Sequence, residues 1–271
     1  MMNKDVSVVF GANGSIGSIV AEKESLSSHV IGTYRRDDKI SDKMKKHSNI
    51  TMIQKNFLED YDVTDVIKLA RTKGRITKVY WMAGSSWNMG WDNASLLDFQ
   101  KAIQVNALPI ASAITSLIPE LSDETNLMRW VAVTGTSSLI IPEGVNKPTT
   151  GGSKKLNEFY IKSAAAFWSC KNNLFNTVIN GMSERKKFAT CGNTPEERAH
   201  DVATQVPLRR EAQPNEIAEI CLWLNSDKNT FTTGGEIVCD GGEHIHTKNN
   251  YNDTPNRKHP KYYTKNKEEK K

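Results

Sequence analysis

Three glycines near the start of the chain stand at a spacing that can bind phosphate. Gly11, Gly14 and Gly17 lie between an apolar run that ends at Phe10 and a helical apolar pattern that begins at Ile16. Glycines at a strand–helix junction allow a tight turn and close approach of a pyrophosphate, and the helix N-terminus offers unpaired N–H groups. The segment therefore predicts a dinucleotide-binding turn rather than an ordinary strand–helix connection. Its predicted cofactor-binding residues are Gly11, Asn13, Ser15, Ile16 and Gly17.

The residues after the next apolar run indicate which dinucleotide is bound. A carboxylate at this point contacts the ribose hydroxyls of NAD, whereas an arginine pairs with the 2′-phosphate of NADP. Arg35 and Arg36 come first, so we predict NADP as the cofactor. Asp37 follows Gly17 by 20 residues, so NAD stays an alternative. A solvated strand end is the structural alternative for the two arginines.

Cysteine and histidine residues show no spacing typical of a metal site. The four cysteines lie far apart, and the sequence has no Cys-x-x-Cys pair and no Cys/His cluster. His244 and His246 have no third ligand nearby in the sequence, so we predict no bound metal. Widely spaced cysteines are typical of a reducing compartment, and we recognise no secretion signal, so we expect a cytoplasmic protein.

Apolar patterns along the chain alternate between short strands and helices. Strands are predicted at residues 6–10, 29–34, 50–55, 77–83, 130–134, 174–179 and 236–239. Helices are predicted from residue 16 onward and at residues 63–70, 96–117, 153–170 and 214–224. Because parallel strands need crossover connections, this order predicts an α/β fold with a doubly wound, Rossmann-like parallel sheet in a single domain. Ligands of such a sheet lie outside the carboxyl ends of its strands.

The net charge of the chain is concentrated in its last part. The chain has 36 basic and 31 acidic residues, of which residues 245–271 hold eight and three. The remaining 28 and 28 cancel, which argues against a nucleic-acid-binding face on the body. We therefore predict a folded domain over residues 1–244 and a basic, disordered tail over residues 245–271. The longest apolar run, residues 108–121, is too short to span a membrane.

Motifs in the second half of the chain resemble those of the short-chain dehydrogenase/reductase family. They are Pro207-Leu208-Arg209-Arg210, Gln213-Pro214-Asn215-Glu216-Ile217-Ala218, Thr233-Gly234-Gly235 and Asp240-Gly241-Gly242. Met82-Ala83-Gly84 and Gln104-Val105-Asn106-Ala107 resemble two further family motifs, and the resemblance covers residues 6 to about 243. It implies hydride transfer between a nicotinamide cofactor and a carbonyl or alcohol group of a small molecule.

The resemblance also implies where the reacting groups lie. Lys154 matches the family's lysine, four residues after the position of the catalytic tyrosine, which is Thr150 here. Ser137 and Ser138 precede Thr150 by 13 and 12 residues, so either one matches the serine that orients the carbonyl. Asn106 matches the helix asparagine that supports a proton relay. Further cofactor contacts are implied for Asn56, Phe57, Ala83, Gly84, Lys154 and Gly181.

Thr150 is the main departure from the family pattern. The family's tyrosine is the acid and base of the reaction, and an aliphatic hydroxyl is far less acidic than a phenol. Gly151 and Gly152 beside it are expected to leave room for a larger side chain. Ser15, Asn56, Asn180 and Arg185 also replace residues that are usual in the family.

Three functions are compatible with these motifs. The first, which we favour, is an NADP-dependent oxidoreductase with an altered acid–base group. The second is a non-redox enzyme on the same scaffold, such as a cyclase, isomerase or dehydratase. The third is a nucleotide-binding protein without catalysis, because a fold does not fix a function.

Aromatic residues suggest a substrate pocket and a subunit interface. Trp87 and Trp91 follow the fourth predicted strand and are candidates either for lining a substrate pocket or for packing. The family commonly associates through its long helices, and the predicted helix at residues 153–170 carries Phe159 and Phe167. More aromatic surface than one buried stripe needs is typical of an interface, so we expect a homodimer or homotetramer.

Overall fold

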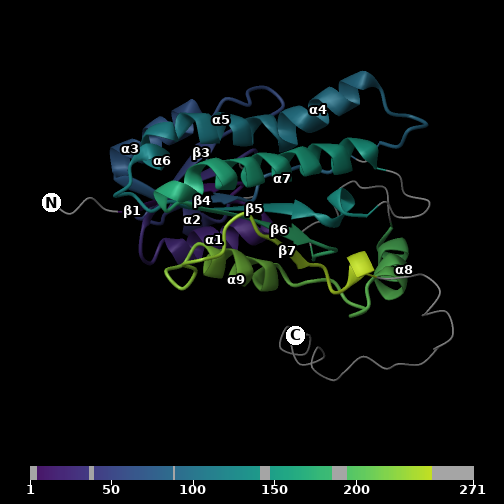
Figure 1. The fold of residues 1–271 in the computed structure, drawn as a ribbon. Coiled ribbons are helices and arrows are strands. Elements are labelled where there is room, and N and C mark those ends of the chain that lie inside the picture. Colours follow the sequence, from purple (N-terminus) through teal and green to yellow (C-terminus); the bar gives the residue numbers. More distant parts are fainter. Residues whose placement is uncertain (1–4, 37–39, 88, 141–146, 185–193, 246–271) are drawn as a thin grey trace, which may run out of the picture.

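The computed structural model describes residues 5–36, 40–87, 89–140, 147–184 and 194–245. Within these ranges seven parallel strands form one sheet in the order β3-β2-β1-β4-β5-β6-β7 (Figure 1). The strands are β1 (Asp5–Phe10), β2 (His29–Tyr34), β3 (Ile50–Gln54), β4 (Arg75–Trp81), β5 (Arg129–Gly135), β6 (Leu174–Asn180) and β7 (Glu236–Cys239). The predicted α/β fold with a parallel, Rossmann-like sheet is confirmed.

Helices cover both faces of the sheet (Figure 1). One face carries α1 (Ser15–Glu24), α2 (Asp42–Lys45) and α9 (Pro214–Leu224), and the other carries α3 (Thr64–Lys73), α4 (Leu96–Asn106), α5 (Leu108–Ser116), α6 (Ile118–Ser122) and α7 (Pro148–Trp168). The helix α8 (Pro195–Gln205) lies beyond the carboxyl ends of the strands, and short 3-10 turns are η2 (Thr136–Ser138), η3 (Ser169–Lys171) and η4 (Glu243–Ile245). No helix of the described residues is long and apolar enough to cross a membrane.

Two hydrophobic cores, one on each face, hold the helices to the sheet. On the α7 face the fully buried Trp81 ring lies 4.3 Å from Phe10 and 5.6 Å from Phe57, measured between ring centroids. Trp130 and Phe175 pair on neighbouring strands at 6.0 Å. Because large rings dominate the apolar area that is buried, these pairs hold β1 against β4 and β5 against β6.

The helix that the sequence predicts at residues 96–117 is two helices in the structure. The chain breaks at Ala107, whose φ of −126° and ψ of −49° end α4 before α5 begins at Leu108. The physical cause is Pro109, which lacks an N–H group and whose ring would collide with the carbonyl of the preceding turn of a continuous helix. The break places Asn106 at the C-terminus of α4 rather than in the middle of a helix.

Two further boundaries differ from the prediction. The helix α7 begins at Pro148, five residues earlier than expected, because proline is well suited to the first turn of a helix. Thr150 therefore lies inside α7. The helix α8 and the short α2 are not anticipated from the apolar pattern. Residues 246–271 of the predicted tail, together with Asp37 and Arg185, lie outside the described residues.

The amino ends of the strands are joined by a buried carboxylate. Glu24 on α1 is 6% exposed and accepts hydrogen bonds from Ser7 Oγ at 2.8 Å and Tyr80 OH at 2.7 Å. Lys78 Nζ lies 3.1 Å from the same carboxylate. A buried charge needs such partners, because an unpaired one costs several kcal/mol. This network therefore ties α1 to β1 and β4 at the edge opposite the carboxyl ends.

Candidate active site

The strand order reverses at β1, whose neighbours are β2 and β4. A crevice outside the carboxyl end of β1 follows from this arrangement. The chain turns sharply there at Gly11, which has a φ of +80°. A side chain at Gly11 would put its Cβ 2.9 Å from Ala83 Cα, and one at Gly17 would come within 2.2 Å of Gly11 O. Both positions therefore require glycine.

The glycine turn is bound to the end of β2. Gly11 N donates to Thr33 Oγ1 at 2.9 Å, and Asn13 Nδ2 donates to the Arg36 carbonyl at 3.2 Å. Gly14 is the N-cap of α1, and no side chain caps the first turn of this helix. The N–H groups of that turn, at Ser15, Ile16 and Gly17, are therefore offered to a ligand, and the positive end of the helix dipole favours an anion.

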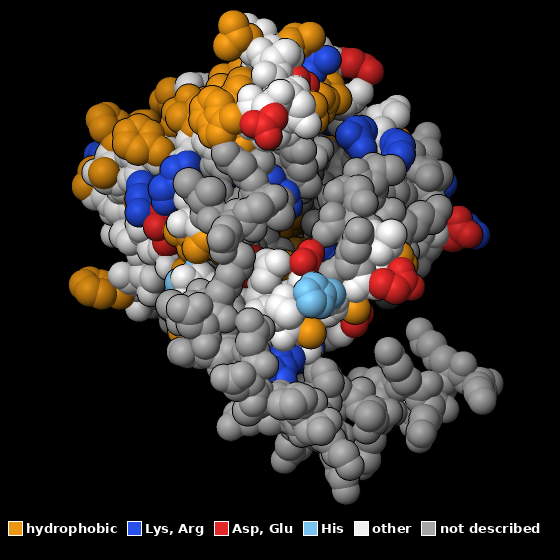
Figure 2. All heavy atoms as spheres, turned by 90° about the vertical axis from the view of Figure 1, so that its right-hand side faces the viewer, with side chains coloured by type: hydrophobic (Ala, Val, Ile, Leu, Met, Phe, Trp, Pro, Cys, Tyr) orange, Lys and Arg blue, Asp and Glu red, His pale blue; other side chains and the backbone are white. Residues whose placement is uncertain are grey.

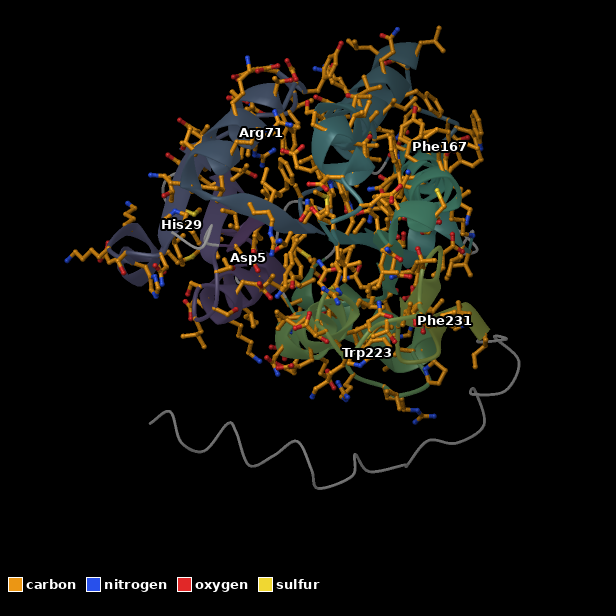
Figure 3. All side chains as sticks on the ribbon, turned by 60° about the vertical axis from the view of Figure 1, so that its left-hand side comes forward. Asp5, His29, Arg71, Phe167, Trp223 and Phe231 are labelled. Carbon is orange, nitrogen blue, oxygen red and sulfur yellow. The ribbon has the colours of Figure 1, made fainter. Side chains whose placement is uncertain are left out.

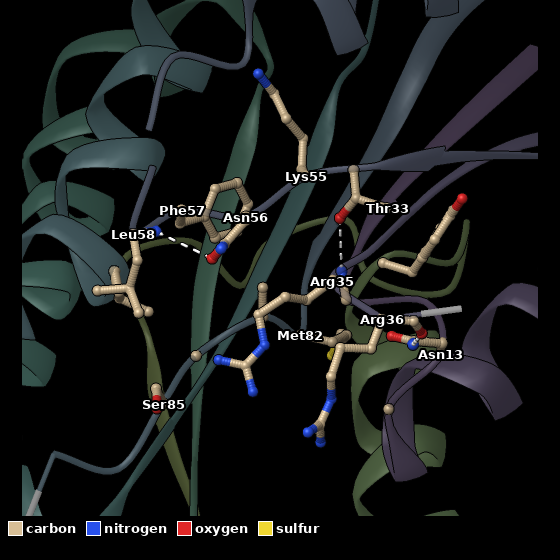
Figure 4. A pocket seen from close by; sticks show the side chains of 16 residues that line it. Asn13, Thr33, Arg35, Arg36, Lys55, Asn56, Phe57, Leu58, Met82 and Ser85 are labelled. Atoms are coloured by element: carbon tan, nitrogen blue, oxygen red, sulfur yellow. Dashed lines mark hydrogen bonds between the residues drawn. The ribbon is translucent and has the colours of Figure 1, made fainter. Parts of the chain in front are cut away.

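A cavity of about 190 Å³ opens beside this turn (Figure 4). Figure 4 shows the side chains of Arg35 and Arg36 next to each other, with both guanidinium groups directed into the cavity. Neither forms an ion pair with a carboxylate of the described residues. The cavity is lined by Gly11, Asn13, Gly14, Thr33, Tyr34, Arg35, Arg36, Lys55, Asn56, Phe57, Leu58, Met82, Ala83, Gly84, Ser85 and Val105.

Most of the residues predicted for cofactor binding line this cavity, but half of the residues in its wall were not predicted. Asn56 lies in the wall, but its amide donates to Glu59 Oε1 at 2.7 Å and its Oδ1 accepts from Leu58 N at 3.3 Å. The sequence analysis missed Thr33, which anchors Gly11, and Lys55, whose ammonium pairs with Asp60 and Asp65. Both residues stand at the carboxyl ends of strands, and this position could have marked them in the sequence as residues of the cavity wall.

Asn106 joins three elements through its side chain. Its Oδ1 accepts from Ser85 N at 2.8 Å, and its Nδ2 donates to Ser85 O and Ser153 Oγ, both at 3.0 Å. Its backbone carbonyl accepts from Asn157 Nδ2 at 3.2 Å. With every polar atom of the amide bonded, Asn106 holds the segment after β4 against α4 and α7.

The two candidate serines have different surroundings. Ser138 Oγ donates to the Gly135 carbonyl at 3.0 Å and also to Glu158 on α7. Glu158 is fully buried and accepts from Thr134 Oγ1 at 2.7 Å as well. The hydroxyl of Ser138 is therefore turned toward the helix. Ser137 is half-buried, and within the described part of the chain no hydrogen bond to its hydroxyl is found.

Lys154 lies at the carboxyl ends of β5 and β6. A Cβ at Gly135 would be 2.7 Å from Lys154 Nζ and 3.4 Å from the Asn180 carbonyl. Glycine at position 135 therefore leaves the space that the ammonium group occupies. Gly181 follows β6 directly, and a Cβ there would meet Asp240 Cβ at 2.7 Å and Glu243 Oε2 at 2.8 Å. The predicted residues Lys154 and Gly181 thus lie at adjacent strand ends.

Thr150 and its neighbours form a crowded helix start. Thr150 is 2% exposed, and Thr149, which is 1% exposed, donates to the Trp87 carbonyl. A Cβ on Gly151 would lie 2.3 Å from the Ser137 carbonyl oxygen, whereas one on Gly152 would meet nothing within 4 Å. These distances concern side chains on the two glycines themselves, so the expectation of room for a larger side chain at position 150 stays a prediction. Gly151 lets α7 approach η2 (Thr136–Ser138), which is called the serine turn from here on.

The tryptophans after β4 are engaged with α4. Trp87 Nε1 donates to Asp98 Oδ1 at 2.9 Å, and the Lys101 ammonium lies 5.8 Å from the Trp87 ring centroid. Trp91 packs on Phe99 with ring centroids 5.6 Å apart, yet it stays 67% exposed. These contacts support a packing role for Trp87, whereas one face of the Trp91 ring stays accessible.

The doubly wound sheet and the glycine turn at its switch point define a nucleotide-binding protein of the Rossmann class. Residues 11–244 match the sequence family described as "Enoyl-(Acyl carrier protein) reductase". The chain therefore belongs to the short-chain dehydrogenase/reductase family of oxidoreductases. The match spans the glycine turn, the serine turn, α7 and the Asp240-Gly241-Gly242 segment.

Two curated relatives illustrate the likeness in sequence. The 3-oxoacyl-[acyl-carrier-protein] reductase FabG of Aquifex aeolicus is 27% identical over 88% of this chain and 96% of its own length. The short-chain dehydrogenase/reductase bsc3 of Alternaria brassicicola is 28% identical, but this match covers only 34% of each chain.

Solved structures share the fold at low sequence identity. The Pseudomonas aeruginosa RhlG/NADP active-site complex has a TM-score of 0.77 at 20% identity and covers 89% of this chain and 96% of that one. A 4-hydroxyisoleucine dehydrogenase complexed with NADH has a TM-score of 0.80 at 19% identity and covers 90% and 100%. Proteins with this fold thus carry either nucleotide, and the choice has to come from side chains in the cavity.

Gly151 and Gly152 offer a matched pair of substitutions on α7. We expect Gly151→Ala to push the serine turn away from α7, because its Cβ would overlap the Ser137 carbonyl, and to lower the melting temperature. Gly152→Ala should raise stability by about 0.5–1 kcal/mol, because alanine is the better helix former and has open space. Thermal unfolding followed by circular dichroism measures both. Equal melting temperatures for the two variants would contradict the close approach.

Proposed function

We propose that this protein is an NADP-dependent oxidoreductase that interconverts a carbonyl and an alcohol group of a small molecule. The observation that carries the proposal is the pair of guanidinium groups, Arg35 and Arg36, in the cavity beside the glycine turn. Two cations without a described carboxylate partner are suited to the 2′-phosphate that distinguishes NADP from NAD. Membership of an oxidoreductase family supports the reaction class.

The residues of the cavity fit a dinucleotide phosphate. Gly11 and Gly17 leave a turn that no side chain fills, and the uncapped first turn of α1 faces the pyrophosphate position. The guanidinium groups of Arg35 and Arg36 would hold the 2′-phosphate, and Lys154 would hold the ribose on the nicotinamide side. The bound nucleotide supplies the hydride.

The groups at the ends of β5 and β6 would act on the substrate. Ser137 is the better candidate for the carbonyl, because the hydroxyl of Ser138 is bound to the buried Glu158. Asn106 would keep the segment after β4 in place through Ser85. A hydroxyl that donates to the developing oxyanion stabilises the transition state more than the ground state.

A second function is favoured by one observation. Thr150 is 2% exposed and carries an aliphatic hydroxyl; if it occupies the position of the family's tyrosine, as the sequence resemblance implies, the site has no phenol at that place. A non-redox enzyme or a nucleotide-binding protein without catalysis on this scaffold would need no such group. Oxidation of NADPH by a panel of ketones, followed by absorbance, separates these functions from a reductase.

The arginine pair gives a test of cofactor choice. The double variant Arg35→Ala, Arg36→Ala should weaken NADPH binding tenfold or more, because charge-assisted hydrogen bonds contribute about 1.5–3 kcal/mol and about 1.4 kcal/mol is tenfold in affinity. Binding of NADH should change little. Quenching of tryptophan fluorescence measures both affinities. Arg75→Ala, at the amino end of β4, is the control, and an equal loss for both nucleotides would refute the assignment.

Substitution of the two serines is expected to have opposite effects on catalysis and on stability. Ser137→Ala should lower kcat for carbonyl reduction by about 10²–10³, which is typical for loss of one oxyanion donor, and leave NADPH binding and the melting temperature unchanged. Ser138→Ala should instead lower the melting temperature by several degrees, because it removes a hydrogen bond from the buried Glu158, worth about 1–3 kcal/mol. Steady-state kinetics and thermal unfolding of both variants decide which serine faces the substrate. The reverse pattern would exchange their roles.

We also propose that the chain forms a homodimer or homotetramer through α7. Phe159 and Phe167 are 65% and 68% exposed, and Figure 3 shows Phe167 on the outside of this helix. The Phe167 ring packs edge-on against Trp168 at 4.9 Å, which extends the apolar surface. Exposed aromatic side chains that adjoin one another are typical of a protein interface.

Light scattering tests this assembly. The wild type should be a dimer or tetramer at micromolar concentration, and the double variant Phe159→Ser, Phe167→Ser should shift it toward the monomer. Leu26→Ser, at a leucine after α1 that is 84% exposed, is the control and should leave the mass unchanged. A wild type that is monomeric at this concentration would exclude α7 as an interface.

A further inference from the structure

A buried carboxyl group lies where the reacting end of the cleft is expected. Glu243 belongs to the turn η4 after β7, is 8% exposed, and accepts a hydrogen bond from Thr136 Oγ1 at 3.1 Å. Its Oε2 is also 2.8 Å from the Cβ position of Gly181. Thr136 directly precedes Ser137, so the carboxyl group lies between the ends of β5 and β6, next to the serine turn.

This face of the molecule is hollowed. Figure 2 views the edge at which the strands of Figure 1 end, and it shows a depression with acidic and histidine side chains at its margin. His244 follows Glu243, and its Nδ1 lies 2.8 Å from Asp240 Oδ2. The imidazole is therefore held by one nitrogen, while its side chain stays 34% exposed.

The charges around Glu243 determine its protonation. Burial is the largest influence and raises the pKa of the carboxyl group, and the neighbouring Asp240 raises it further. Hydrogen bonds from Thr136 and from the backbone of Met182, and the positive charge of Lys147 at the start of α7, act in the opposite direction. The net result is a pKa above the ordinary value of 4.5.

A proton donor is needed at this place if the chain is a reductase. Hydride addition to a carbonyl carbon leaves a negative oxygen that has to be protonated. Thr150, at the position of the family's tyrosine, is buried and carries only an aliphatic hydroxyl. The sequence between β5 and the end of β6 contains one tyrosine, Tyr160 on α7. Its ring packs against the hydrophobic core, so Tyr160 is not a candidate for this proton donor.

We infer that Glu243 is the acid–base residue of the reaction, in place of the missing phenol. The inference rests on the proposed reductase function. In the reduction, the O–H bond of the Glu243 carboxyl group breaks and its proton passes to the carbonyl oxygen, while hydride from the bound nucleotide adds to the carbonyl carbon. The carboxylate that remains takes a proton from solvent. The overall change is ketone, NADPH and one proton to alcohol and NADP⁺.

The test compares Glu243→Gln with the wild type. Glutamine keeps the size of the side chain and can still accept from Thr136, but it has no carboxyl proton to give. We expect kcat for ketone reduction to fall by about 10²–10⁴, the usual contribution of general acid catalysis, with the affinity for NADPH unchanged. Glu24→Gln, which removes a buried carboxylate at the amino ends of the strands, is the matched control and should leave kcat as it is.

The pH dependence gives a second criterion for the active enzyme. Because the reaction needs the protonated carboxyl group, kcat of the wild type should fall as the pH rises through the raised pKa. The residual rate of Glu243→Gln should lack this titration. The charged groups that act on Glu243 are Asp240, in its own segment, and Lys147, at the start of α7. Both of them, and His244 next to Glu243 in the turn, stay in place in both proteins.

A third measurement needs no turnover. A folded-state pKa above the unfolded value means that the folded protein binds more protons, so stability falls as the pH rises above 4.5. The difference in melting temperature, wild type minus Glu243→Gln, should therefore decrease from pH 4.5 upward and become constant above the folded-state pKa. A difference that is constant from pH 5 to 8 would show an ionised carboxylate and overturn the inference.

The kinetic outcomes separate the inference from the proposed function. An active wild type with a disabled Glu243→Gln supports both. An active wild type with an equally active Glu243→Gln overturns the role of Glu243 and leaves the reductase function standing. A wild type that binds NADPH but reduces no ketone overturns the reductase function, and the role of Glu243 as its acid with it.

Discussion

The close approach of β1 and β4 beyond their carboxyl ends is the constraint on which the site depends. Gly11 lies so near Ala83 that no side chain fits between them, and α1 begins so close to the turn that Gly17 is equally restricted. This packing points the uncapped N-terminus of α1 into the crevice. The positions of the arginine pair and of the segment after β4 follow from it, because Thr33 and Asn13 bind the turn to β2.

Much of the scaffold can be predicted from the sequence. Apolar runs locate the strands to within about two residues, because a fully buried parallel strand has to be apolar on both sides. The break between α4 and α5 is also present in the sequence at Pro109, although an apolar pattern alone conceals it. The cofactor cavity is predictable for a similar reason, since Gly11, Arg35 and Ala83 all come within two residues after the end of a strand.

The chemical end of the site is less predictable, because it depends on contacts between distant segments. Nothing local distinguishes Ser137 from Ser138, and the difference comes from Glu158, 20 residues after Ser138. A signal for Glu158 existed, since it is a charged residue in the buried stripe of α7 that continues at Ile161 and Ala165. Glu243 is separated from Thr136 by 107 residues, so only the folded chain reveals that they meet.

The ionic contacts of α7 have a mechanical consequence. Lys155 bridges Glu158 at 2.8 Å, Lys162 contacts Glu236 of β7 at 2.8 Å, and Glu158 holds the serine turn. The Lys155–Glu158 bridge lies within α7, but a sliding motion of the helix along its axis would break both the Lys162–Glu236 contact and the Ser138–Glu158 hydrogen bond. Movement of α7 is therefore coupled to the serine turn and to β7. Widening of the cleft on the α7 side would cost these two contacts, so a bulky substrate is more easily admitted by a shift of the opposite wall.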